Sequence, residues 1–357
     1  MLNWLLIFVP IAVALEHFAP QRYLLVFLAS ALAILPLAGW MSRATEHLAE
    51  KTGEGVGGLL NATFGNAAEL IIALAALRAG LHDVVKASLA GSIVGNILLV
   101  LGASMFAGGL GRSEQHFNES GARSQATLLT LAAIALIIPA VYSKLLGVNF
   151  PEGLGSLSVS IAVVLLVVYA LFLVFSLVTH RTLFMGSLEI EDQKEPSIPW
   201  PVSKAVLILG ASTAAIAWVS EILVGAIEPT AHDFGLSNTF VGVFIVAILG
   251  NAAEHASAVS AAMKNRMDLS LSIAIGSSVQ VALFVAPVLV LASLLVGPKP
   301  MNLVFSGGLI LAVLLSVLIT GQVAGDGRSD WLKGVQLLAV YLILGLAFFF
   351  VPGAPAP

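Results

Sequence analysis

The stretch GNAAE occurs twice in this chain, at residues 65–69 and again at residues 250–254. Each copy lies inside an apolar run long enough to cross a bilayer, and each ends in a glutamate, Glu69 or Glu254. A charged side chain at the centre of a membrane is costly, so such residues are expected to serve a function. The two copies therefore predict a membrane protein with a pair of buried carboxylates.

The composition of the whole chain agrees with this prediction. Hydrophobic residues make up 59% of the 357 residues and charged residues only 10%, whereas soluble domains are about 25% charged. The formal net charge is -4 and the basic residues are scattered, which argues against a nucleic-acid partner. The absence of cysteine excludes disulfides and thiolate metal sites.

A membrane-spanning helix needs about 20 mainly apolar residues. Such runs predict an all-α polytopic membrane protein, because lipid-exposed backbone groups must be hydrogen-bonded within each segment and the runs are too long for barrel strands. The windows predict about eleven transmembrane helices, near 2–18, 22–41, 56–77, 84–108, 124–142, 155–179, 201–226, 236–262, 268–296, 302–320 and 331–351. No basic residue precedes the first run, so we expect a first span there rather than a cleavable signal.

An internal duplication divides the chain. At an offset of 185 residues, 13 of the 38 positions from 57 to 94 are identical, including the Asn and Glu of GNAAE, Asp83 with Asp268, and Ser92 with Ser277. The predicted organisation is an extra N-terminal span (1–20), a first five-helix repeat (21–180), an acidic linker (181–200) and a second five-helix repeat (201–357). Because five is odd, the repeats are expected to be inverted, as in many secondary transporters.

Basic residues predict the orientation, because loops rich in Lys and Arg remain in the cytoplasm. Alternate loops hold 11 of the 16 basic residues on one side and 5 on the other. We expect a multi-pass protein of a bacterial or archaeal plasma (inner) membrane, with the N-terminus and the linker in the cytoplasm and the C-terminus outside. The acidic linker is either a solvated connection or a segment with a role of its own, as a surface that attracts cations or a regulatory segment.

The residues around the two carboxylates predict a cation site. Asn66 and Asn251 each precede their Glu by three residues, and Gly65 and Gly250 are candidate helix breaks that would free backbone carbonyls. Further oxygens come from the spans that follow, at Ser88, Ser92, Asn96, Ser277 and Gln280. Hard oxygen donors with two carboxylates suit a calcium ion, so Glu69 and Glu254 are the predicted metal and proton ligands.

Structural interpretations remain beside this one. Asn, Glu and Ser side chains also hold helices together in membranes. His255 is a candidate proton relay, and it is equally compatible with a packed or pore-lining histidine. Asp83 and Asp268 fit the first turn of a helix, and His47 and His232 are expected at the ends of loops.

The segments GNAAELIIAL and GNAAEHASAV resemble the two signature repeats of the cation/proton exchanger family, within the calcium/cation antiporter superfamily. GSIVGNILLVLG at 91–102 and GSSVQVALFVAP at 276–287 are similar to the helices that follow in that family. The resemblance covers nearly the whole chain. It implies calcium export in exchange for protons, with Glu69 and Glu254 as ligands, Asn66 and Asn251 supporting them, and Ser92, Ser277 and Gln280 lining the site. His255 stands where the family often has a histidine.

The functional hypothesis is therefore a secondary active calcium/proton antiporter that works by alternating access, with calcium ions, protons and the bilayer as partners and with no cofactor. Exchange of manganese, or of sodium or potassium for protons, is the alternative, and homo-oligomers are compatible with the sequence. A passive channel is less favoured, because the duplication fits alternating access better than a continuous pore. We do not expect an enzyme, since neither a nucleophile with a paired base nor a His-rich zinc motif is visible.

Overall fold

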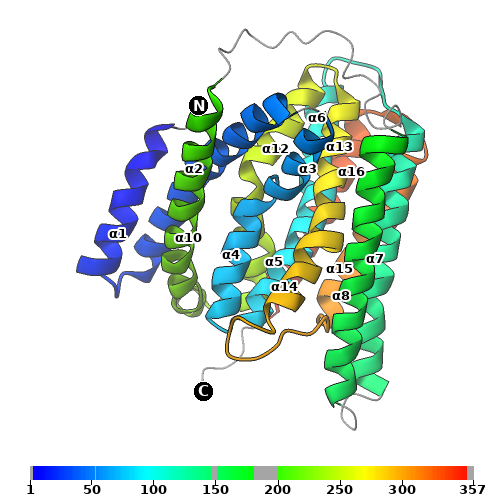
Figure 1. Ribbon diagram of the computed structural model, residues 1–357. Coiled ribbons are helices and arrows are strands. Elements are labelled where there is room, and N and C mark those ends of the chain that lie inside the picture. Colours follow the sequence, from blue (N-terminus) through cyan, green and yellow to red (C-terminus); the bar gives the residue numbers. More distant parts are fainter. Residues whose placement is uncertain (1–2, 53, 146–150, 181–199, 352–357) are drawn as a thin grey trace. The chain divides into compact units, whose positions relative to one another are not determined.

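The structure is a computed structural model that describes residues 3–52, 54–145, 151–180 and 200–351, and these residues are almost entirely helical (Figure 1). Nine helices within these ranges are long and apolar enough to cross a membrane. They are Tyr23–Thr52, His82–Gly109, Glu119–Leu145, Gly153–Thr179, Val202–Asp233, Asn238–Met263, Met267–Ala292, Gly307–Ala324 and Trp331–Phe349. Each coincides with one of the eleven predicted windows.

The other two windows are not single long helices. At the N-terminus, the 3-10 helix η1 (Asn3–Ile7) and α1 (Phe8–Phe18) together form a shorter apolar helix. The window 56–77 is divided into α3 (Glu54–Phe64) and α4 (Ala67–Arg78) by a turn at Gly65 and Asn66. The break therefore falls within the first GNAAE copy.

The described residues form two compact units, which cut across the two sequence repeats. The first contains η1, α1, α2 (Tyr23–Thr52), α3, α4, the first half of α5 (His82–Val94), α10 (Val202–Asp233), α11 (Asn238–Phe240), the π-helix η4 (Val241–Val246) and the start of α12 (Ala247–Met263), with the end of α16 (Trp331–Phe349). Within it α2 packs along α10, and α1 and α3 pack against α2. Figure 1 shows α1, α2 and α10 as neighbours.

The second unit contains most of the remaining helices. They are the rest of α5, the π-helix η2 (Gly95–Val100), α6 (Leu101–Gly109), α7 (Glu119–Leu145), α8 (Pro151–Val174), the π-helix η3 (Phe175–Thr179), the rest of α12, α13 (Met267–Gln280), the π-helix η5 (Val281–Val285), α14 (Ala286–Ala292), α15 (Gly307–Ala324) and most of α16. A short antiparallel ribbon of β1 (Gln115–His116) and β2 (Arg328–Ser329) joins two of its loops. In this unit α7 packs against α15, α13 and α8.

Glycine allows α16 to approach α6 closely. A Cβ atom on Gly334 would lie 2.6 Å from the backbone oxygen of Gly102, closer than real Cβ contacts come. Helices in membranes associate through small residues of this kind, because close backbone approach increases van der Waals contact. The contact places α16 against α6 within the second unit.

The bounds of the helices recur at the offset of the sequence repeat. Moving α5 and η2 forward by 185 residues gives 267–279 and 280–285, which coincide with α13 and η5 to within one residue. The turn before each pair also recurs: Leu81 N donates to Ala76 O, and Arg266 N donates to Ala261 O. Gly80 (φ 80) corresponds to Asn265 (φ 60), which is the one non-glycine residue with positive φ in the described part of the chain. The inverted orientation of the repeats stays a prediction.

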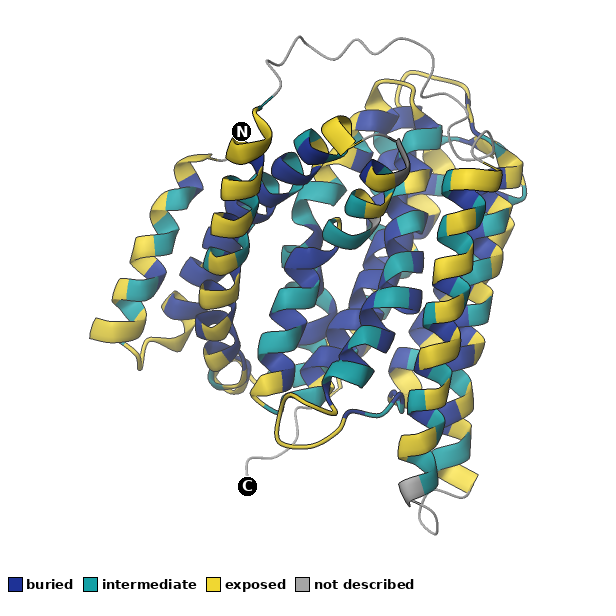
Figure 2. Cartoon of the chain, viewed as in Figure 1, coloured by how far each residue is buried: buried dark blue, intermediate teal, exposed yellow. Residues whose placement is uncertain are grey.

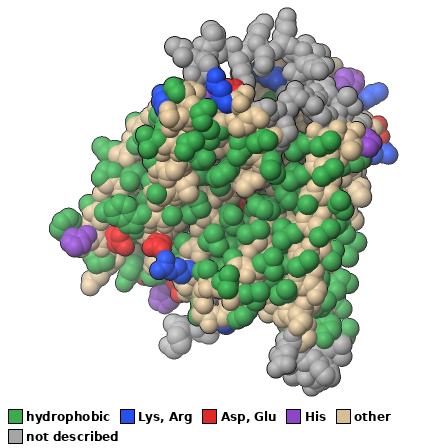
Figure 3. All heavy atoms as spheres, viewed as in Figure 1, with side chains coloured by type: hydrophobic (Ala, Val, Ile, Leu, Met, Phe, Trp, Pro, Cys, Tyr) green, Lys and Arg blue, Asp and Glu red, His purple; other side chains and the backbone are tan. Residues whose placement is uncertain are grey.

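The surface suits a lipid environment. Exposed residues run in stripes along α7 and α10 (Figure 2), and hydrophobic side chains cover much of the face in Figure 3. On α8 the exposed side chains include Val163, Val164, Val167 and Leu171. With nine long apolar helices in the described ranges, the chain is a multi-pass integral membrane protein. The predicted acidic linker lies almost wholly outside the described residues.

Candidate functional site

The break between α3 and α4 positions the first carboxylate. Asn66 precedes α4, and Glu69 is the third residue of that helix with only 2% of its surface exposed. The first turn of a helix presents backbone N–H groups without intrahelical acceptors, and the helix dipole favours negative charge there. The break thus provides a favourable position for a buried carboxylate.

Asn251 contacts this carboxylate from another helix. Its Nδ2 donates to Glu69 Oε2 at 3.4 Å and to the backbone oxygen of Ala247 at 3.2 Å, and Asn251 is 2% exposed. The sequence predicted each Asn beside the Glu of its own copy. In the structure the amide of the second copy serves the carboxylate of the first, because α12 crosses α4 at this point.

Gly250 lies at this crossing, directly against Glu69. A Cβ atom at residue 250 would lie 3.4 Å from Glu69 Cβ and 3.5 Å from Glu69 Cα. The helix break predicted at Gly250 is wrong, since α12 runs through it without interruption from Ala247 to Met263. The local distortion occurs earlier, in the π-helix η4, and the glycine serves close packing instead.

A second close approach lies about two turns before, at Gly242. A Cβ atom on Gly242 would lie 2.6 Å from Ala87 Cβ and 3.0 Å from the backbone oxygen of Val84. Residue 242 must therefore be glycine for η4 to cross α5 at this distance. Ser88, next to Ala87, is 4% exposed in the same unit.

The second carboxylate lies in the second unit, in different surroundings. Glu254 is half-buried in the middle of α12, away from any helix end, and the Ser277 side chain of α13 hydrogen-bonds to it. Its Oε2 is buried and has no hydrogen-bond partner among the described residues. A buried carboxylate oxygen without a partner is costly, which suits a group that takes up an ion or a proton.

His255, the next residue, contacts a buried amide of η2. His255 Nε2 lies 3.0 Å from Asn96 Oδ1, and Asn96 is 1% exposed. The Asn96 Nδ2 is buried without a partner in the described part of the chain. The histidine and the amide therefore form a pair, separate from the carboxylate of Glu254.

The structure also places the remaining predicted residues. Ser92 (2% exposed) lies in α5 and Ser277 (5% exposed) in α13, both in the second unit, while Gln280 ends α13 and is half-buried. Asp83 and Asp268 lie in the first turns of α5 and α13 as predicted.

His47 differs from its predicted position at the end of a loop, because it lies inside α2. There its ring stacks on Trp200 with the centroids 4.6 Å apart. His232 lies in the last turn of α10.

The Glu69 cluster offers carboxylate and amide oxygens, and the Glu254 cluster offers carboxylate and hydroxyl oxygens. No group of three or more His, Asp or Glu side chains that could hold a metal ion occurs among the described residues. A cation bound here would need hydroxyl, amide or backbone oxygens as well as carboxylates, which is the ligand set of a hard cation such as calcium.

The contact between Asn96 and His255 is not predictable from the sequence repeat. At the offset of 185, Asn96 corresponds to Val281 and His255 to Leu70. The pair thus exists in one copy only. The spacing of Asn96 with Ser92 places it on one helix face but gives no indication of its partner.

Two glutamates within apolar helices, one buried beside an amide at a helix break and one half-buried beside a serine hydroxyl, are typical of ion-transport proteins. The match to a known family is specific. The family model described as "Sodium/calcium exchanger protein" matches residues 22–178 and 204–350, so the chain belongs to that family. This match confirms the resemblance at the level of the calcium/cation antiporter superfamily. Relatives named as Ca(2+)/H(+) antiporters support the cation/proton exchanger family within it.

Curated relatives extend over nearly the whole chain. It is 44% identical over 364 aligned residues to a Ca(2+)/H(+) antiporter of Aphanothece halophytica, with 98% of this chain and 96% of the relative covered. It is 45% identical to the Ca(2+)/H(+) antiporter ChaA of Bacillus subtilis, with 89% and 90% covered. The solved structure of native YfkE is similar at a TM-score of 0.80 and 40% identity, covering 97% of this chain and all of that one.

Proposed function

We propose that this protein is a secondary active antiporter that exports calcium from the cytosol in exchange for protons. The relatives named as Ca(2+)/H(+) antiporters support the proposal at 44% and 45% identity. The observation that carries it is the contact of Asn251 with the buried Glu69 at the start of α4. An amide donor and the start of a helix hold a buried carboxylate there, and such a carboxylate is a suitable ligand for a transported cation.

Charge balance couples the two ions in this proposal. Two glutamates, Glu69 and Glu254, match the charge of one calcium ion, and two protons neutralise them equally well. An uncompensated pair of carboxylates is costly to move through the membrane interior, so the empty, ionised protein should not reorient. About two protons per calcium ion follow from this balance of charge.

The test measures calcium uptake into proteoliposomes after an imposed pH step. An antiporter concentrates calcium against its gradient, whereas a channel only equilibrates it. Glu69→Gln and Glu254→Gln keep the shape of the side chain and remove its charge, so each should abolish uptake. Glu221→Gln is the matched control, because Glu221 is exposed on α10 and pairs with Arg78 at 2.8 Å. Uptake near the wild-type rate in either site variant, correctly inserted, would refute the two-carboxylate mechanism.

Competing cations decide the ion range. The description of the matched family names sodium as well as calcium, so sodium and potassium gradients belong beside the pH step, with manganese as a competitor. Calcium uptake that follows a sodium gradient and ignores the pH step would replace the proton with sodium in the proposal.

A further inference from the structure

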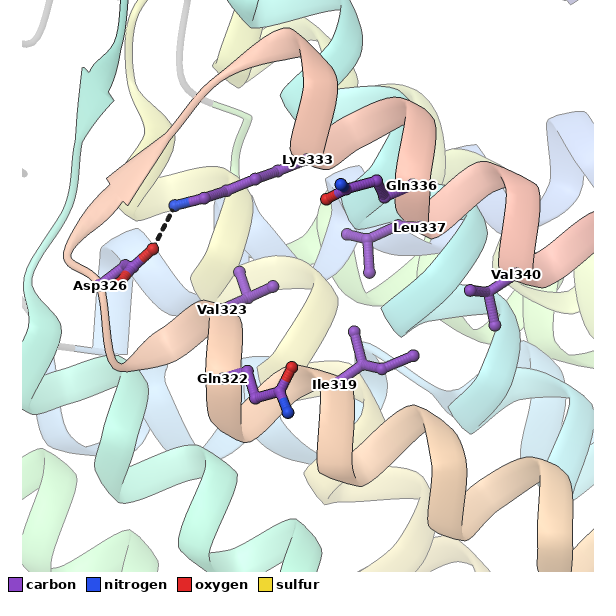
Figure 4. Close-up of a pocket in the computed structure, with 8 residues that line it drawn as sticks. All are labelled: Ile319, Gln322, Val323, Asp326, Lys333, Gln336, Leu337 and Val340. Atoms are coloured by element: carbon purple, nitrogen blue, oxygen red, sulfur yellow. Dashed lines mark hydrogen bonds and ion pairs between the residues drawn. The ribbon is translucent and has the colours of Figure 1, made fainter.

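A cleft of about 290 Å³ lies between α15 and α16, and it belongs to neither of the carboxylate clusters (Figure 4). α15 packs against α7, and α16 lies against α6 through Gly334, so two consecutive helices leave an opening between them. Ligand clefts usually measure roughly 300 to 1,000 Å³. A cleft at the lower end suits part of a long molecule whose remainder lies in the bilayer.

The side chains that line the cleft change in character along its length. Asp326 and Lys333 lie at the end near the connecting loop, where Lys333 Nζ is 2.6 Å from Asp326 Oδ2 (Figure 4). Gln322 and Gln336 come about one helical turn further in along their helices, and Ile319 and Val340 about one turn beyond those. The order is charged pair, amides, aliphatic groups.

The charged end lies at the level expected for the edge of the membrane. Trp331 begins α16 two residues before Lys333 and is 48% exposed. Exposed tryptophans are enriched where lipid headgroups meet the hydrocarbon. The ion pair is therefore at headgroup depth, with the amides below it.

The two amides need partners at that depth. Gln322 and Gln336 are exposed, and neither side chain makes a hydrogen bond within the described residues. Amide groups facing hydrocarbon without partners are unfavourable. The carbonyl oxygens of lipid esters, one layer below the headgroup, would accept hydrogen bonds from amide N–H groups.

The ion pair leaves one donor and one acceptor unused. Lys333 Nζ donates to Asp326 Oδ2 and, at 2.9 Å, to the backbone oxygen of Arg328, and an ammonium has three N–H groups. Asp326 Oδ1 has no partner among the described residues. Hydrogen bonding to Lys333 lowers the pKa of Asp326 below its usual value, so the carboxylate is ionised at neutral pH.

The surrounding charges are not positive overall. The Arg328 Nη1 lies 3.5 Å from Glu114 Oε2, and Asp330 Oδ1 accepts from the backbone N of Lys333 at 2.9 Å. A site with two cations and three anions does not favour a ligand of net negative charge. It favours a neutral ligand that carries both signs, with a phosphate to accept from Lys333 and an ammonium to donate to Asp326.

We propose that this cleft binds one molecule of phosphatidylethanolamine, with its headgroup at Asp326 and Lys333, its ester oxygens at Gln322 and Gln336, and one acyl chain against Ile319 and Val340. Phosphatidylcholine lacks the N–H donors for Asp326. Phosphatidylglycerol lacks the ammonium, so it offers that carboxylate neutral hydroxyl donors in place of a positive charge, and its net charge is negative. The inference does not depend on calcium/proton exchange.

The test uses the purified full-length protein and native mass spectrometry, with equal amounts of the three lipids in detergent. Wild type should retain one phosphatidylethanolamine in preference to the other two by about tenfold, or about 1.4 kcal/mol. Asp326→Asn should remove the preference for phosphatidylethanolamine over phosphatidylglycerol. Lys333→Gln should weaken the retention of both of these lipids, because each carries a phosphate. Val340→Trp should fill the inner end and lower retention while leaving the ion pair intact. Lys264→Gln, at an exposed lysine outside the cleft, is the control.

Several outcomes would overturn the proposal. Equal retention of the three lipids by wild type would remove the basis for a specific headgroup site. A preference that is unchanged in both Asp326→Asn and Lys333→Gln would place the lipid elsewhere. Free phosphoethanolamine that competes as well as the lipid would show that the acyl chain and ester contacts contribute nothing. Since the measurement contains no transport step, failure here leaves the exchange proposal untouched, and the reverse holds as well.

Discussion

Ser278 Oγ donates a hydrogen bond to the backbone oxygen of Ile93 at 3.5 Å, and these two residues are 185 positions apart, the offset of the sequence repeat. A residue that contacts its own counterpart must lie near the axis that relates the two copies. An inverted duplication predicts such an axis, so this contact is where the repeats would meet within the second unit.

The first prediction concerns this contact. Ser278 is fully buried, and its single hydroxyl hydrogen is shared between Ile93 O and the backbone oxygen of Ala274, which lies at 3.0 Å. Ser278→Ala should lower the free energy of unfolding by about 1 kcal/mol, the usual net contribution of a buried hydrogen bond. Ser270→Ala is the matched control on the same helix, because the Ser270 hydroxyl is buried without a partner in the described residues. Thermal unfolding in detergent should show a lower midpoint for Ser278→Ala than for Ser270→Ala. An equal change in both variants would mean that the hydrogen bonds of Ser278 do not stabilise the protein.

The second prediction concerns the size of the side chain at residue 250. A single added methyl group would meet Glu69 at 3.4 Å, which is tolerable, whereas a larger side chain would enter the space of the carboxylate. Gly250→Ala should therefore reduce calcium uptake by about twofold, and Gly250→Leu by more than tenfold, because overpacking costs roughly 1–3 kcal/mol. Gly225→Leu on α10 is the control, since nothing lies within 4 Å of a Cβ atom there. Normal uptake in Gly250→Leu would mean that the crossing does not position Glu69.

The fold was largely predictable from the sequence, because long apolar runs in lipid leave few alternatives to helices. Nine of the windows became long helices in the described residues, and the turn at Gly65 fell inside the first GNAAE copy. Gly250, its counterpart, behaved differently. A glycine permits either a break or a close approach, and only the neighbouring helix decides which occurs.

The partners in the site were less predictable for a related reason. Spacing along one helix suggested Asn66 for Glu69, yet the bond that the structure gives comes from Asn251 on another helix. Contacts between helices depend on which faces meet, and a hydrophobic pattern that is apolar all round does not specify a face. The repeat predicted the residue types, and it could not predict this contact between two helices.

Orientation gives the third prediction. The excess of basic residues predicts that the α6–α7 loop is in the cytoplasm and the segment after α14 is outside. The chain has no cysteine, so Ser113→Cys and Lys299→Cys, both at exposed positions, give single labelling sites. An impermeant thiol reagent should modify residue 299 in intact cells and residue 113 only in inverted vesicles. The opposite pattern would reverse the direction of transport that we propose.

Asp326 provides the fourth prediction, on pH and stability. Its hydrogen bond with Lys333 lowers the folded-state pKa below the ordinary value of 3.8. A lowered pKa means that the pair stabilises the protein fully above about pH 4 and ceases to do so as the carboxylate is protonated at lower pH. The difference in thermal midpoint between wild type and Asp326→Asn should therefore shrink between about pH 5 and about pH 3. Because the pair is exposed, added salt should shrink it too, and a difference that grows as the pH falls would contradict the assignment.

The pairing of His255 with Asn96 allows a choice between a structural and a proton-carrying histidine. The contact at 3.0 Å satisfies one ring nitrogen, and the amide of Asn96 is buried. His255→Gln keeps a group that can hydrogen-bond to Asn96 but cannot carry a proton, so we expect exchange within about threefold of wild type. His255→Leu leaves the amide unpaired, at a cost of roughly 1–3 kcal/mol, and should reduce exchange by about tenfold or more.

The double variant His255→Leu with Asn96→Leu supplies the decisive comparison. Replacing both partners of a buried hydrogen bond by apolar groups is often nearly neutral, whereas removing one partner leaves the other unsatisfied. If the histidine only packs, the double variant should recover much of the exchange that His255→Leu loses. If His255 carries protons, the double variant and His255→Gln should both stay inactive in the pH-step assay while remaining inserted and folded. The two roles thus predict opposite results from the same three proteins.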